Sequence, residues 1–175
     1  PDLDPATRYY GLMAYGNYSN GWGLFYDQTN DIIAFNILGS WAFSTSPLLS
    51  TYGIDLSDGA WHHIEVNRWA DDWGIWVDGR QCGYKTSGDS LPAVSSEQHF
   101  YVGLAYVDSA WRYGRGNLDE LRFVKNAYFH KPGVDLSGVY YPADFTPPAA
   151  AYADDDDFVV ATRGECDEMV VQVTW

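Results

Sequence analysis

Alternation of residues with a period of two, interrupted by tight turns over residues 61–83, constrains this fold more than any other feature. The period is that of a β-strand, and it places Ile64 and Val66 on one inward face. Residues 70–72 predict a turn, residues 73–77 a returning strand, and Asp78-Gly79 a second tight turn. The stretch therefore predicts antiparallel hairpins. In the first strand of the first hairpin, one face carries His62, Ile64, Val66 and Arg68. The opposite face carries His63, Glu65 and Asn67.

Shorter strand-like runs occupy much of the remaining chain. Residues 21–26 and 31–38 flank a turn at 27–30 and predict a second hairpin. Residues 48–52 are a weaker candidate strand, and residues 100–104 and 118–124 are clearer ones. No stretch sustains a helical period, and residues 125–129 are the best candidate for a short helix. The sequence therefore predicts an all-β fold.

Length and composition indicate one domain with a tail. A chain of 175 residues buries enough surface to fold without a disulfide or metal, and its 17 glycines and 17% aromatic residues favour strands and turns. We expect a body over residues 1–148 and an exposed acidic linker over 149–157, where four adjacent aspartates repel one another. A C-terminal hairpin arm over 158–175 should pack on the body or on a neighbouring chain, because an isolated hairpin is marginal in water.

The net charge narrows the choice of partners. The chain has 24 acidic and 10 basic residues, and its formal charge of −14 repels phosphate backbones and anionic lipid, so neither nucleic acid nor membrane is expected. No apolar run approaches the roughly 20 residues of a membrane-spanning helix. The acids either keep the surface soluble or hold cations in turns. Cys82 and Cys166 are either two thiols or one bridge from tail to body.

Four segments in a fixed order carry a resemblance to a known superfamily. DGAWHHIEVNR and WGIWVDGRQCG, at 58–68 and 73–83, look like a Trp-His-His strand followed by a strand ending in Val-Asp-Gly. FYVGLA at 100–105 and GNLDELRFVKNA at 116–127 resemble two later strands. Together they resemble the laminin-G-like, concanavalin A-like lectin/glucanase superfamily. DFTPP at 144–148 resembles the closing segment seen often in its bacteriophage structural members.

The resemblance implies an antiparallel jelly-roll β-sandwich of the concanavalin A-like kind. The superfamily usually opens with a strand pair of the FTIEFWV type, and no such segment precedes Gly21, although RYYGLMAYG at 8–16 resembles its end. Either the chain lacks its first strands, or the C-terminal hairpin or a partner completes the sandwich. Residues 130–144 exceed the usual link to the closing segment, and such loops often hold contacts.

Catalysis is not expected. The resemblance implies that a hydrolase of the superfamily would carry a Glu-x-Asp-x-x-Glu strand. Retaining hydrolysis needs two carboxylates about 5–5.5 Å apart. No such run exists here, and Asp119 and Glu120 are adjacent, so they point to opposite faces of a strand. His62 and His63 are also adjacent and cannot easily share one metal ion. A degenerate glycoside hydrolase is the second alternative.

No cofactor is required, although a structural calcium ion is compatible with the sequence. The resemblance implies calcium at Asp119, where some lectin-like relatives use an aspartate. Asp71, Asp72 and Asp108 are alternatives in turns, because turn carboxylates and backbone carbonyls suit Ca²⁺. The other interpretation is that Asp119 accepts backbone N–H bonds and supports a loop.

Two aromatic and polar clusters are candidate glycan sites. Apolar sugar faces stack on Trp or Tyr while Asp and Arg bind hydroxyl groups, but the same residue types fill cores and protein interfaces, so both interpretations stay open. One cluster is Trp69, Asp71, Asp72 and Trp73, and the other is Tyr106, Asp108, Trp111, Arg112 and Tyr113.

The tail supplies the predicted docking surface, because an unpaired apolar strand pair suits addition to a neighbouring sheet. Its docking residues are Phe158, Val159, Val160, Val170, Val171, Val173 and Trp175. With the resemblance, they predict a non-enzymatic module on a bacteriophage virion surface, docked to capsid or tail proteins or to copies of itself, with host-surface glycans as a further ligand. The alternative is a secreted bacterial carbohydrate-binding or adhesion domain.

Overall fold

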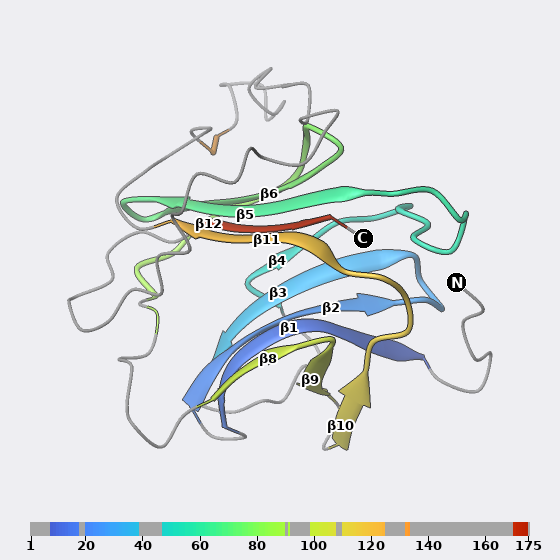
Figure 1. Ribbon diagram of the computed structural model, residues 1–175. Coiled ribbons are helices and arrows are strands. Elements are labelled where there is room, and N and C mark those ends of the chain that lie inside the picture. Colours follow the sequence, from blue (N-terminus) through green and yellow to red (C-terminus); the bar gives the residue numbers. More distant parts are fainter. Residues whose placement is uncertain are drawn as a thin grey trace. The chain divides into compact units, whose positions relative to one another are not determined.

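The computed structural model shows a chain built from β-strands (Figure 1). The structure describes residues 8–17, 20–38, 47–89, 91, 99–107, 110–124, 132–133 and 170–174. These residues contain no helix, and all of their strand pairings are antiparallel, so the predicted all-β class is confirmed. The helix expected at 125–129 lies outside them. The chain divides into two compact units, residues 1–60 with 89–117 and residues 61–88 with 118–175.

The first unit contains a five-stranded sheet in the order β4-β3-β2-β1-β8 and a separate hairpin. The predicted hairpin within residues 21–38 is confirmed, since β2 and β3 pair from Gly21 opposite Leu38 to Asp27 opposite Ile32. Residues 8–16, expected to be only the end of an opening strand, form most of β1, an interior strand between β2 and β8. The elements are β1 (Tyr9–Asn17), β2 (Asn20–Asp27), β3 (Ile32–Leu38), β4 (Leu49–Ser50), β8 (His99–Val102), β9 (Leu104–Val107) and β10 (Ala110–Tyr113).

Residues 100–104 do not form the single strand predicted for them. The chain bends at Gly103, whose φ of +67° favours glycine, so β8 ends at Val102 and β9 begins at Leu104. β9 then pairs with β10, with Tyr106 opposite Trp111. The described residues of the second candidate glycan cluster therefore lie on a separate β-hairpin.

This hairpin packs against β1 through main-chain contacts. A Cβ at Gly11 would overlap the backbone nitrogen of Ala105 and lie 2.6 Å from the carbonyl oxygen of Arg112. The backbone N–H of Gly103 donates to the carbonyl of Leu12 at 2.7 Å. Close approach of the two backbones thus fixes the position of the hairpin. The apolar cluster around this contact comprises Ala14, Phe25, Ala34 and Ala105, with Tyr9, Ile32, Tyr101 and Tyr106 packed against it.

The second unit contains a five-stranded sheet in the order β11-β12-β5-β6-β7. The predicted hairpin is confirmed, because β5 and β6 pair from Ile64 opposite Val77 to Trp69 opposite Asp72. The elements are β5 (His63–Trp69), β6 (Asp72–Val77), β7 (Arg80–Thr86), β11 (Asp119–Val124) and β12 (Val170–Thr174).

Residues with positive φ form the turns between β5 and β6 and between β6 and β7. Ala70 has a φ of +51° in the β5–β6 turn, while Asp78 and Gly79 have φ values of +51° and +82° in the β6–β7 turn. Two successive positive φ values are those of the type I′ turn that Asp-Gly predicts. Ile64 and Val66 are completely buried, as predicted.

β12 lies between β5 and β11, where Figure 1 shows the red strand beside the orange one. Residues 170–174, which we expected in a C-terminal hairpin that packs on the body or on a neighbouring chain, form an interior strand of this sheet. The other predicted arm at 158–162 lies outside the described residues, as do Trp175 and Cys166. The alternatives for the two cysteines therefore stay open.

Candidate functional site

A group of partly exposed aromatic residues lies on the β9–β10 hairpin. The ring centroid of Trp111 is 4.9 Å from that of Tyr101 and 5.4 Å from that of Tyr106, which meets it edge-on. Trp111 is 39% exposed, and Tyr113, two residues further along the same strand face, is 70% exposed. Two tyrosine rings therefore support an indole that remains partly open to solvent. We refer to Tyr101, Tyr106, Trp111 and Tyr113 as the aromatic platform.

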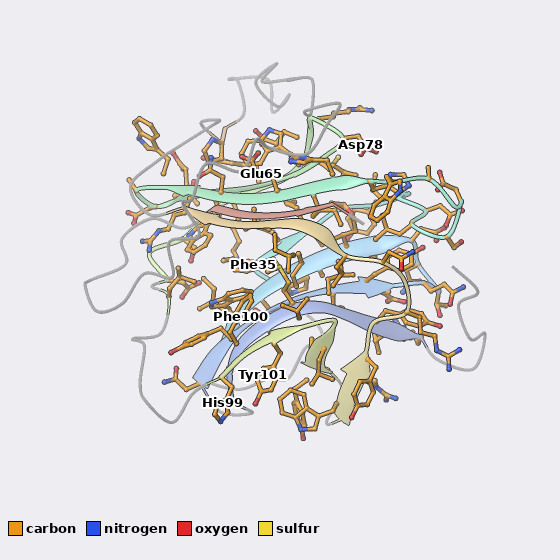
Figure 2. The ribbon with its side chains drawn as sticks, in the orientation of Figure 1. Phe35, Glu65, Asp78, His99, Phe100 and Tyr101 are labelled. Atoms are coloured by element: carbon orange, nitrogen blue, oxygen red, sulfur yellow. The ribbon has the colours of Figure 1, made fainter. Side chains whose placement is uncertain are left out.

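Tyr101 joins the platform from β8, not from the hairpin itself. Figure 2 shows His99, Phe100 and Tyr101 along β8, with Phe100 on the opposite side of the strand from Tyr101. The His99 ring lies 6.1 Å from the Tyr101 ring, whereas the Phe100 ring lies 6.0 Å from that of Trp22. Tyr101 and His99 are not among the predicted site residues, although strand alternation places both on one face.

The platform includes some of the predicted glycan-binding residues and excludes Arg112. Arg112 lies opposite Ala105 and follows Trp111 on β10, so it points to the other face of the hairpin. Asp108 lies outside the described residues. The phenolic hydroxyl groups of Tyr101 and Tyr106 and the imidazole of His99, which lies beside Tyr101, are polar groups of this surface, and each can donate or accept hydrogen bonds.

The predicted cluster at the β5–β6 turn does not form an open aromatic surface. Trp73 is completely buried, and its indole N–H donates to the carbonyl of Ser87 at 3.1 Å. The Arg68 guanidinium lies 4.9 Å from the Trp73 ring centroid, a cation–π contact. Trp69 is half-buried, and the exposed Asp71 carboxylate lies 3.8 Å from Arg68. Trp73 thus offers no sugar-stacking face, because the sheet and Arg68 cover it.

Asp72, the remaining member of that cluster, joins two strands. Its Oδ1 accepts hydrogen bonds from the Tyr84 hydroxyl at 2.6 Å and from the Thr86 hydroxyl at 3.0 Å. The two donors lie on β7 and the acceptor on β6. These bonds occupy Oδ1 of Asp72 and hold β7 against β6.

The two adjacent histidines occupy different environments. Nδ1 of His62 lies 2.8 Å from Oδ2 of Asp78, and the backbone N–H of His63 donates to Oδ1 of the same carboxylate at 2.9 Å. The His63 side chain is buried, 5% exposed. Asp78 therefore ties the start of β5 to the β6–β7 turn.

The second unit also buries an acid that is not among the predicted site residues. Glu65 is 1% exposed, and burial, partly offset by a hydrogen bond with Asn67, raises its pKa to about 7. Glu65 lies opposite Trp76, which lies opposite Gln81. The Gln81 amide exchanges two hydrogen bonds with the backbone of Gly133, at 3.2 and 3.3 Å. This strand face is thus covered, although its polar alternation is typical of a solvated surface.

The described residues hold no group of three or more His, Cys, Asp or Glu side chains able to bind a metal ion. Asp119 is the first residue of β11, opposite Thr174, and its side chain lies outside the described part of the chain. Calcium at Asp119 therefore stays a prediction.

Comparison with known proteins identifies no relative of this chain. No family model, no curated protein and no solved structure matches it. Among the residues that the structure describes, no helix is long and apolar enough to cross a membrane.

Proposed function

We propose that this chain is a non-enzymatic adhesion module that binds carbohydrate through the aromatic platform. The observation that carries the proposal is the support of the partly exposed Trp111 ring by Tyr101 and Tyr106. An indole in a fixed orientation offers a flat apolar surface to the C–H face of a sugar ring. Because neighbouring rings already restrict the indole, binding costs less side-chain entropy than it would at an isolated tryptophan.

The charge of the chain favours a neutral glycan. A formal charge of −14 repels uronic and sialic acids, and Arg112, the cation within β10, points away from the platform face. Phenolic hydroxyl groups and an imidazole suit the hydroxyl and acetamido groups of neutral hexoses and hexosamines. We therefore expect neutral sugars to bind more tightly than acidic ones.

The proposal extends to the architecture and location of the module. The antiparallel sheets and the order of the four resembling segments support a concanavalin A-like β-sandwich. The segment at 144–148 supports a place on a bacteriophage particle, docked to capsid or tail proteins. Both parts of this extension depend on fold-level analogy.

A glycan array with matched tryptophan variants tests the carbohydrate site. Trp111→Ala should weaken binding about 10- to 100-fold, the loss typical of a stacked aromatic anchor. The control is Trp61→Ala, which removes a 56% exposed tryptophan outside the platform and should bind as the unaltered chain does. Absence of binding by the unaltered chain, or equal binding by both variants, would contradict the proposal.

The location of the chain is tested separately on purified particles. Antibody labelling in electron micrographs should place it on the virion surface. Detection only in bacterial culture fluid would favour the secreted adhesion domain. Turnover of any polysaccharide by the purified chain would contradict its non-enzymatic role.

A further inference from the structure

The aromatic platform and His99 together form a surface that is longer than one sugar ring. Trp111 and Tyr113 are two residues apart on β10, so the rise of the strand separates their side chains by about 7 Å along one face. On β8 the His99 ring lies 6.1 Å from the Tyr101 ring, which lies 4.9 Å from the Trp111 ring. A pyranose ring is close in size to one six-membered aromatic ring. One sugar stacked on Trp111 therefore leaves His99 and Tyr113 uncovered.

The residues on either side of Trp111 are open to solvent. Tyr113 is 70% exposed and His99 is also exposed, whereas Trp111 itself is 39% exposed. A pocket for a single small molecule encloses most of the surface of its ligand, and such exposed side chains enclose little. The exposed phenol and imidazole instead leave both directions from Trp111 accessible to further sugars of the same chain.

The rings of this surface are not coplanar. The Trp111 ring is inclined at 57° to that of Tyr101 and at 78° to that of Tyr106, and the His99 ring is inclined at 76° to that of Tyr101. A flat layer of packed polysaccharide chains can stack on only one of these rings at a time, because stacking requires nearly parallel planes. A single chain whose successive sugars turn can stack on one ring and contact the next.

We propose that this surface binds internal sugars of a single neutral polysaccharide chain, with one sugar stacked on Trp111 and its neighbours over Tyr113 and His99. The inference rests on the proposed carbohydrate binding and specifies the class of ligand. The phenolic hydroxyl of Tyr113 and the imidazole of His99 can exchange hydrogen bonds with sugar hydroxyl groups. Because each of these exposed contacts is weak, affinity accumulates with the number of linked sugars that bind at once.

NMR titration of the full chain with oligosaccharides of increasing length tests the proposal. The probes are two neutral series, the maltose series and the chitobiose series, each from the monosaccharide to the hexasaccharide. In at least one series, affinity should rise about 100-fold from the monosaccharide to the tetrasaccharide and little beyond it. Equal affinity for the monosaccharide and the hexasaccharide would overturn this inference and leave the carbohydrate site intact. If no member of either series binds, the inference is wrong, and the glycan array decides separately whether the chain binds carbohydrate.

Two variants at exposed positions shorten the surface. Tyr113→Ala and His99→Ala should each lower the affinity for the hexasaccharide about 10-fold and leave that for the monosaccharide unchanged, since a single sugar stacks on Trp111. Trp111→Ala should weaken the binding of both ligands. The control is Tyr52→Ala, which removes a 77% exposed tyrosine outside the surface and should bind both ligands as the unaltered chain does. Unchanged affinity of the Tyr113 and His99 variants for the hexasaccharide would contradict the extended site.

A second measurement uses the unaltered chain and tests the inclination of the rings. Crystalline cellulose and crystalline chitin present flat layers of packed chains, on which the inclined rings cannot all stack. A sedimentation assay should therefore leave most of the chain in solution, while the soluble hexasaccharide binds. Retention on either crystalline polysaccharide with an affinity equal to that for the soluble hexasaccharide would show that the surface accepts flat layers, and the single-chain ligand would then be wrong.

Discussion

The backbone nitrogen of Ala105 lies so close to Gly11 that no side-chain carbon fits between β1 and β9. Tyr106 follows Ala105 on β9, and Tyr101 belongs to β8, which pairs with β1. The contact at Gly11 therefore controls how closely the two tyrosines approach Trp111. The geometry of the aromatic platform depends on a residue that has no side chain.

Gly11→Ala should displace the β9–β10 hairpin from β1. The added carbon meets backbone atoms, which cannot rotate away, and overpacking of this kind costs about 2–3 kcal/mol. We expect the free energy of unfolding in urea to fall by that amount and carbohydrate binding to weaken with it. Gly88→Ala is the control, because no atom lies within 4 Å of a Cβ there, and it should leave stability almost unchanged. Equal stability of the two variants would contradict the close packing at Gly11.

An ion pair at the β2–β3 turn should make stability sensitive to acid. The Asp27 carboxylate accepts hydrogen bonds from Arg8 and from the Asn30 side chain, each at 2.8 Å, and from the Thr29 N–H at 3.1 Å. Burial alone would raise the pKa of Asp27, but these donors outweigh it and hold the pKa below its usual 3.8. The stabilisation is therefore complete above pH 3.8 and is lost as the pH falls through the lowered pKa.

Asp27→Asn tests this dependence, because it keeps the shape of the side chain and removes its charge. We expect the variant to be less stable by about 1–3 kcal/mol at neutral pH, and the difference to shrink as the pH falls below 3.8. Asp71→Asn, at an exposed turn, is the control and should change stability little at any pH. A difference between Asp27→Asn and the unaltered chain that stays constant down to low pH would contradict the ion pair.

The alternation of residues 63–69 and the Asp78-Gly79 pair suffice to predict β5, β6 and the β6–β7 turn. Both features depend on interactions over a few residues. The burial of Trp73 and Glu65 is not predictable in the same way, since it depends on what covers each face of the sheet. On the Glu65 face, residue 133, far along the chain, bonds to Gln81.

The candidate site is also only partly predictable from local sequence patterns. Trp111 and Tyr113 are identifiable from sequence as an aromatic pair, but Tyr101 joins them only because the chain bends at Gly103. The sequence predicts a strand at residues 170–174, yet its position in the sheet depends on β5, which lies far upstream. Local patterns thus identify the elements, and long-range pairing decides which of them meet.

The buried Glu65 should make the chain less stable as the pH rises. The folded chain holds this proton to about pH 7, whereas an ordinary glutamate releases it near 4.5. Between these values the unfolded state binds fewer protons, so the free energy of unfolding falls with rising pH, by about 3 kcal/mol over the window. Glu65→Gln keeps the shape of the side chain and should remove this fall in urea denaturation measured from pH 4.5 to 7. Parallel profiles of the two chains would mean that the folded chain does not retain this proton.

Asp78 should stabilise the β6–β7 turn chiefly through its carboxylate and its backbone conformation. Its φ of +51° is tolerated by Asp and Asn but strained for Ala, and its Oδ1 accepts the N–H of His63. Asp78→Ala should therefore lower the free energy of unfolding by about 1–2 kcal/mol. Asp78→Asn keeps the conformation and the acceptor and loses only the charge beside His62, so it should recover most of that loss. If urea denaturation showed both variants equally unstable, the charge, and not the turn, would be what stabilises this end of the sheet.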